Sequence, residues 1–136
     1  MIGIVTDSTC DIPENLLEQF GIIVVSQVLI WGEEQYRDRI DLQPSEFYQR
    51  LEVEHQLPHS SQPSQHDFED AYETAASRGF KELIVLTLSS ALSGTFEIAK
   101  TAAKSFKIPI EVIDSRVASM GLGWQVLAAA RAQRLL

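Results

Sequence analysis

The sequence lacks the features that mark secreted and membrane-spanning proteins. Cys10 is the only cysteine, so neither an intrachain disulfide nor a multi-cysteine metal site can form. Apolar runs are short and stay below the roughly 18 residues that a spanning helix needs. Met1 leads directly into an apolar stretch without basic residues or a cleavage site, so we expect no secretory signal. These absences favour a protein of a reducing compartment, the cytoplasm.

Basic side chains are also scarce. Lys and Arg together number 11, against 19 Asp and Glu, which gives a net charge of −8. Such a chain repels phosphate backbones and anionic lipid surfaces. We therefore expect no nucleic-acid partner and no stable membrane insertion. With 136 residues and 45% hydrophobic content, the chain is long enough to bury one proper core.

What the sequence does contain is an alternation of two patterns. Apolar, β-branched runs predict strands over residues 2–6, 22–31, 83–88 and 110–113. Amphipathic stretches predict helices over residues 15–20, 44–57, 64–77, 95–106 and 119–136. A hairpin is expected around Gly32, and a polar loop between Pro58 and Ser64. The alternation predicts an α/β fold, with a mainly parallel sheet covered by helices on both faces in three layers.

Hydroxyl side chains gather in four segments, three of which follow predicted strands. The segments are Thr6-Asp7-Ser8-Thr9, Ser60-Ser61-Gln62-Pro63, Ser89 to Thr95, and Asp114-Ser115; the second follows a predicted helix. Ligands of open parallel sheets bind at this edge, where free N–H groups of helix N-termini attract anions. The 89–95 segment has four hydroxyls and a glycine, more than one helix cap requires. These segments predict a site for a small anionic head group.

Other kinds of site find weaker support. No Gly-x-Ser-x-Gly elbow surrounds Ser93, as a serine hydrolase would need. Gly121-Leu122-Gly123 is a poor match to a dinucleotide fingerprint and falls in a predicted helix. The histidines, at positions 55, 59 and 66, are separated by prolines that break any common helix, so we expect them on the solvated surface and predict no metal site.

The order of these segments resembles the DegV family. The resemblance rests on four segments, which are residues 5–13, 60–64, 86–96 and 112–123. It implies a fold of two α/β lobes that hold one long-chain fatty acid between them, with no other cofactor and no catalysis by the lobes themselves. It also implies a separate fatty-acid kinase as a partner, which phosphorylates the presented carboxylate in bacterial lipid metabolism.

Carried to this chain, the resemblance assigns roles to particular residues. Ser60, Ser61 and Ser93 would donate hydrogen bonds to the carboxylate, and Gly94 and Thr95 would shape the loop and start its helix. The residues expected to support the site are Asp7, Ser8, Asp114 and Ser115.

The chain also departs from the family pattern. Ser60 stands where threonine is usual, and His59 where a basic residue is usual. The chain has about half the family's length and stops within a helical pattern at Leu136. We therefore expect residues 1–136 to be the N-terminal domain, truncated within its last helix and without the C-terminal lobe.

Two alternatives remain open at the level of sequence. One is a small hydrolase or phosphotransferase that uses Asp7, Ser8 and Ser93. The other is a structural or regulatory module in which the hydroxyls only cap turns and helices.

Overall fold

A computed structural model describes all residues from 1 to 136. The strands are β1 (Ile2–Asp7), β2 (Ile23–Val25), β3 (Val28–Trp31), β4 (Glu34–Arg37), β5 (His59–Ser61), β6 (Glu82–Thr87) and β7 (Ile110–Asp114). The helices are α1 (Glu14–Phe20), α2 (Pro44–Val53), α3 (Gln65–Ser77), α4 (Thr95–Ala103) and α5 (Met120–Gln133), with a 3₁₀ turn at Ser8–Cys10. Helices α4 and α5 end three residues earlier than the amphipathic pattern predicts, in short turns.

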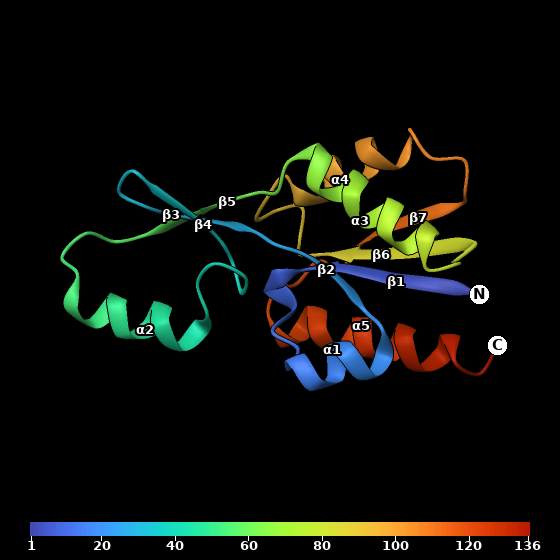
Figure 1. The fold of residues 1–136 in the computed structure, drawn as a ribbon, viewed down its shortest axis with the longest axis horizontal. Coiled ribbons are helices and arrows are strands. Elements are labelled where there is room, and N and C mark those ends of the chain that lie inside the picture. Colours follow the sequence, from blue (N-terminus) through green and yellow to red (C-terminus); the bar gives the residue numbers. More distant parts are fainter.

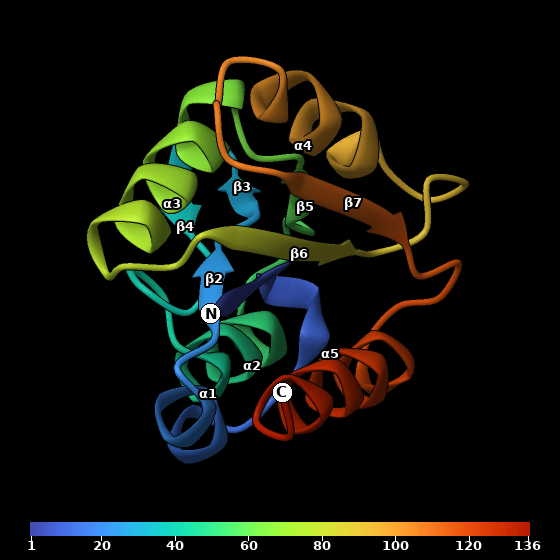
Figure 2. The same ribbon diagram turned by 90° about the vertical axis from the view of Figure 1, so that its right-hand side faces the viewer.

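The main body is a parallel sheet of four strands in the order β2-β1-β6-β7. Helices α3 and α4 cover one face, and α1 and α5 cover the other (Figure 2). The central strands β1 and β6 are almost wholly buried, as expected for strands that are covered on both faces. The predicted three-layer α/β/α fold is confirmed.

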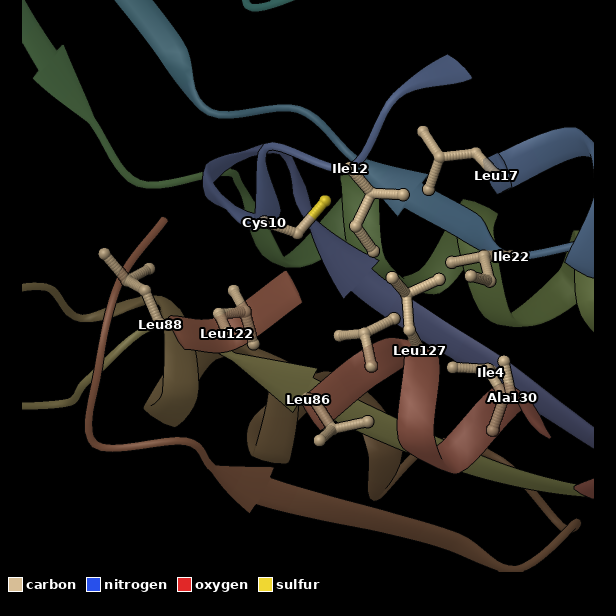
Figure 3. Packing of buried hydrophobic residues seen from close by; sticks show 11 residues of the cluster. Ile4, Cys10, Ile12, Leu17, Ile22, Leu86, Leu88, Leu122, Leu127 and Ala130 are labelled. Atoms are coloured by element: carbon tan, nitrogen blue, oxygen red, sulfur yellow. The ribbon is translucent and has the colours of Figure 1, made fainter. Parts of the chain in front are cut away.

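Two apolar cores lie on the two faces of this sheet, because neighbouring strand residues point to opposite sides. Ile4 and Leu86 point toward α1 and α5, where they meet Leu122 and Leu127 (Figure 3). The opposite core contains Val5, Val85, Phe68, Tyr72, Ala99 and Ala102. The Tyr72 hydroxyl donates to the carbonyl of Ala99 at 2.9 Å, which ties α3 to α4.

A second, antiparallel sheet in the order β4-β3-β5 extends from the main body together with α2 (Figure 1). The sequence predicted one strand over residues 22–31, which was wrong. The run divides at Ser26-Gln27 into β2 of the parallel sheet and β3 of the antiparallel sheet. The hairpin around Gly32, whose φ is +64°, is confirmed. The predicted loop before Ser64 contains the short strand β5 instead.

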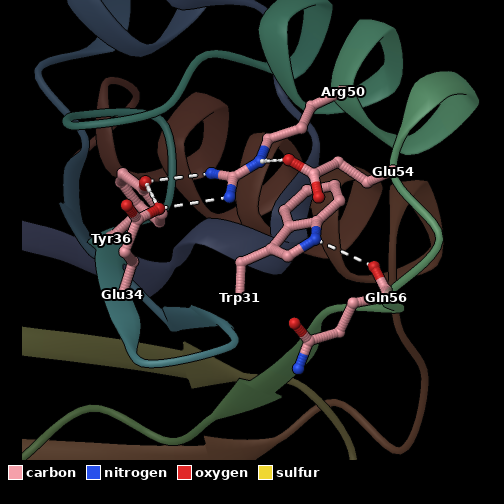
Figure 4. A network of polar contacts seen from close by, with 6 residues as sticks. All are labelled: Trp31, Glu34, Tyr36, Arg50, Glu54 and Gln56. Atoms are coloured by element: carbon pink, nitrogen blue, oxygen red, sulfur yellow. Dashed lines mark hydrogen bonds and ion pairs between the residues drawn. The ribbon is translucent and has the colours of Figure 1, made fainter.

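None of the residues of helix α2 is fully buried. The helix contacts the small sheet through aromatic and charged side chains (Figure 4). The Arg50 guanidinium lies 4.4 Å from the ring centroid of the buried Trp31. It also donates to Tyr36 and forms ion pairs with Glu34 and Glu54. The Tyr36 hydroxyl, followed by the Arg50 guanidinium, lowers the pKa of Glu34 below its usual value.

Gly123 explains why α5 can lie so close to the turn after β1. A Cβ at this position would lie 2.4 Å from the backbone oxygen of Cys10. The Gly121-Leu122-Gly123 segment is inside α5, so its glycines serve helix packing and do not form a loop around a phosphate. No helix is long and apolar enough to cross a bilayer.

Candidate functional site

Strands β1 and β6 end side by side, and Asp7 joins their ends. One carboxylate oxygen of Asp7 accepts hydrogen bonds from the backbone and hydroxyl of Thr9, at 2.9 and 2.5 Å. The other accepts from the backbone N–H of Leu88 at 2.8 Å. Asp7 is fully buried, and both of its oxygens are engaged, so its geometry is that of a support for the two loops. It gives no support to a role as catalytic base.

Ser8 links the same edge to the antiparallel sheet through Gln27. The Ser8 hydroxyl oxygen accepts from the backbone N–H of Gln27 at 2.9 Å. Burial raises the pKa of Asp38 above its usual value, and the Ser8 hydroxyl partly offsets this. The Gln27 carbonyl in turn accepts from the backbone N–H of Asp38 at 2.9 Å.

The 89–95 loop presents Ser93 beside the first residue of α4. The hydroxyl oxygens of Ser93 and Thr95 lie 2.8 Å apart, and the backbone N–H of Thr95 donates to Ser93 Oγ at 3.2 Å. Thr95 is fully buried, whereas Ser93 is partly exposed. The side-chain amide of Gln27 donates to Thr95 Oγ1 at 3.1 Å. Ser93 is therefore the outermost member of an ordered row of polar groups.

Gly94 brings the segment after β5 against the 89–95 loop. A Cβ on Gly94 would lie 2.4 Å from the side-chain oxygen of Gln62, so only a glycine lets that side chain approach so closely. Pro63, the next residue, is buried. The two hydroxyl-rich segments that sequence analysis singled out thus meet at Gln62 and Gly94, although they lie far apart in the chain.

Ser60 and Ser61 are both exposed but point to opposite faces of the small sheet. Ser60 is paired with Leu29, on the face that Trp31 shares toward α2, whereas Ser61 is paired with Val28 on the other face. Leu29 lines a cavity of about 200 Å³ between the small sheet and α2. The two serines therefore present their side chains on opposite sides of β5.

Asp114 and Ser115 shape the far side of the same edge. The carboxylate of Asp114 accepts from the hydroxyl and backbone N–H of Ser90 and from the backbone N–H of Arg116. These bonds, with that of the Ser90 hydroxyl the largest cause, lower the pKa of Asp114. The Ser115 hydroxyl bonds to the backbone of Val117. Both residues thereby hold the loops that follow β6 and β7.

Gln27 is the residue that sequence analysis missed. It lies inside an apolar run, is only 5% exposed, and contacts the ends of three segments through its backbone and side chain. A lone amide within a β-type apolar run was the available indication, because a buried polar group needs partners.

Other candidates lie apart from this edge. The largest cavity, about 530 Å³, is lined by α1, β2 and residues 38–40 and contains none of the predicted site residues. The three histidines are exposed, and His66 lies 3.5 Å from Asp70 on its own helix. No group of three metal-binding side chains occurs.

Comparison with known proteins identifies relatives over nearly the whole chain. A family model described as an uncharacterised protein of the DegV family matches residues 1–134. A DegV domain-containing protein of Caldanaerobacter subterraneus is 40% identical over 131 residues, which are 96% of this chain and 46% of that protein. The chain spans just under half the length of the curated relatives it matches.

Solved structures agree with this match. A fatty-acid-binding DegV family protein from Thermus thermophilus is 35% identical with a TM-score of 0.87, covering 98% of this chain and 47% of that one. A stearic-acid-binding protein from Eubacterium ventriosum is 26% identical with a TM-score of 0.89, covering 98% and 48%. On sequence, length of match and fold together, this chain belongs to the DegV family.

Proposed function

We propose that this chain is the N-terminal lobe of a cytoplasmic carrier that binds one long-chain fatty acid and performs no chemistry on it alone. The observation that carries the proposal is the meeting of the 89–95 loop with the segment after β5, at Gly94 and Gln62. Relatives of the same fold that bind fatty acids support it.

The head group would be held by hydroxyls at this junction. Ser93 is partly exposed, with its oxygen already accepting from the Thr95 N–H, so its hydrogen is available to a carboxylate. Charge-assisted hydrogen bonds of this kind are about twice as strong as neutral ones. Of the serine pair in β5, Ser60 is the better donor in our proposal, because it lies on the same face of the small sheet as Leu29, which lines the cavity beside α2.

The acyl chain would supply most of the affinity, at about 0.8 kcal/mol per buried CH₂. None of the main cavities of this chain is lined by Ser93, so the chain offers no apolar tunnel for the acyl chain beside this residue. We therefore propose that a second lobe, in the part of the family's length that this chain does not span, completes the tunnel and faces the carboxylate.

Native mass spectrometry of the intact protein tests this function. We expect the purified protein to carry one acyl ligand, and a Ser93→Ala variant to retain about one tenth to one hundredth of the affinity for palmitate, since a hydrogen bond to a charged group is worth about 1.5–3 kcal/mol. Ser105→Ala, an exposed serine just after α4, is the matched control. Absence of any acyl ligand, before and after incubation with palmitate, would contradict the proposal.

Presentation to a kinase is the second part of the proposal. A carboxylate at a partly exposed edge stays accessible to a partner, and its oxygen can attack the γ-phosphorus of ATP, so that an acyl phosphate forms and ADP leaves. The palmitate-loaded protein, mixed with a bacterial fatty-acid kinase and ATP, should yield acyl phosphate that hydroxylamine traps. Equal yield from free palmitate would contradict a presenting role.

A further inference from the structure

Gln27 occupies the crossing between the two sheets, where the chain leaves β2 and enters β3. Its backbone N–H donates to Ser8, its carbonyl accepts from Asp38, and its side-chain amide reaches Thr95. Of these three contacts, only the one from the side chain leads toward Ser93, through Thr95.

The direction of each hydrogen bond in this row follows from the chemistry of the groups. An amide nitrogen can only donate, so Thr95 Oγ1 accepts from Gln27 at 3.1 Å. The buried Thr95 hydroxyl must then place its own hydrogen, and the acceptor that it contacts is Ser93 Oγ at 2.8 Å. A buried hydroxyl without an acceptor would cost about 1–3 kcal/mol.

Ser93 Oγ consequently receives two hydrogen bonds, from the hydroxyl and the backbone N–H of Thr95. Its two acceptor positions are then filled. Only the hydroxyl hydrogen of Ser93 then remains without a partner in this row, and it is available to a ligand on the exposed side of Ser93. Hydrogen bonds in such a chain also strengthen one another, by about 10–30% per bond.

We propose that Gln27 is a positioning residue that makes Ser93 an obligate donor, so that the site selects an ionised carboxylate over a neutral alcohol head group. This inference rests on the proposed function. A carboxylate only accepts hydrogen bonds and matches a fixed donor. An alcohol can either donate to Ser93 or accept from it. Its affinity should therefore depend little on whether the Ser93 hydroxyl is fixed as a donor.

The test uses the intact protein, with palmitate and hexadecanol competing separately for a bound fluorescent fatty acid. Gln27→Met keeps the length of the side chain and removes the donor. We expect palmitate affinity to fall about three- to tenfold, less than the loss of a whole charged hydrogen bond would cause, because Ser93 keeps its hydroxyl. Hexadecanol affinity should change less than about twofold. Gln125→Met is the matched control, because Gln125 also donates through its side-chain amide at 3.1 Å, to Ser115.

Thr95→Val, which removes the middle hydroxyl but keeps the shape, should give the same loss of preference for palmitate if Gln27→Met fails to fold. The carboxyl ¹³C shift of labelled palmitate should move in either variant. Equal weakening of both ligands would overturn the inference, since that is the result of a structural role alone. Unchanged binding of both would overturn it too, with the proposed function intact. If the wild-type protein binds neither ligand, the proposed function itself fails.

Discussion

The backbone N–H of Leu88 donates to a carboxylate oxygen of Asp7 at 2.8 Å, across 81 residues of sequence. This bond fixes the end of β6 against the end of β1 and so fixes where the 89–95 loop begins. The same carboxylate holds Thr9 through its other oxygen. One fully buried side chain therefore sets the position of both loops at the edge where we propose that the ligand binds.

Asp7→Asn should destabilise the fold by roughly 2–3 kcal/mol. The substituted amide replaces one acceptor oxygen by an NH₂ group, so either the two Thr9 donors or the Leu88 N–H lose their acceptor. A buried group left unpaired costs about that much. Urea unfolding followed by circular dichroism measures the change. Asp70→Asn, an exposed position on α3, should change the free energy of unfolding by less than about 0.5 kcal/mol. Equal effects of the two substitutions would show that Asp7 does not support the edge.

Gly94→Ala should weaken fatty-acid binding several-fold while leaving the fold within about 1 kcal/mol of the wild type. The backbone angles of Gly94, φ −78° and ψ 3°, suit any residue, so the added methyl acts only by displacing Gln62. Isothermal titration with palmitate measures the loss. The double variant Gly94→Ala, Gln62→Ala should lose no more than Gln62→Ala alone, because the clash is gone. Additive losses would contradict this contact as the cause.

Gly123→Ala should destabilise the protein by about 1–3 kcal/mol, as overpacking does. The new methyl would meet the backbone oxygen of Cys10, which cannot move without shifting the turn after β1. Gly121→Ala, whose methyl would meet only the side chain of Val117, is the control in the same helix and should cost less. Thermal unfolding of both variants decides between close helix packing and a general need for glycine in α5.

Burial raises the pKa of the Cys10 thiol to about 11, above its value of about 9 in the unfolded chain. The thiol therefore favours the folded state only while the unfolded thiol stays protonated. The free energy of unfolding should be constant below about pH 9 and should fall between about pH 9 and 11. The fall is roughly 1.4 kcal/mol for each unit by which the folded and unfolded pKa values of the thiol differ. Urea unfolding of the wild type and Cys10→Ala across this range isolates the effect. Parallel curves would show that the thiol titrates normally.

The layers of the fold follow from periodicity, but the division of residues 22–31 does not. Each half of this run is apolar and forms a strand, β2 mostly buried and β3 mostly half-buried, and nothing in the sequence shows that the two strands belong to different sheets. Only the polar pair Ser26-Gln27 marks the crossing, and the partners of Gln27 come from segments that are distant in the chain. A pattern within one window cannot show them.

Composition and topology identified the polar residues at the strand ends. Which of them are enclosed and which are exposed could be seen only in the structure. Asp7 and Ser93 are both polar groups after buried strands, yet one is fully enclosed and the other partly exposed. Likewise, the opposite directions of Ser60 and Ser61 follow from strand β5, which its polar composition concealed. Tertiary pairing with Leu29 and Val28, not local preference, makes this segment a strand.

The crystal structure of the intact protein with bound palmitate tests the central claim most directly. We predict that one carboxylate oxygen lies within hydrogen-bonding distance, about 2.5–3.0 Å, of Ser93 Oγ. We also predict that the carboxylate lies on the side of β5 that carries Ser60 and not on the side that carries Ser61. A carboxylate bound elsewhere, for example in the cavity between α1 and residues 38–40, with Ser93 free of contacts, would contradict the account.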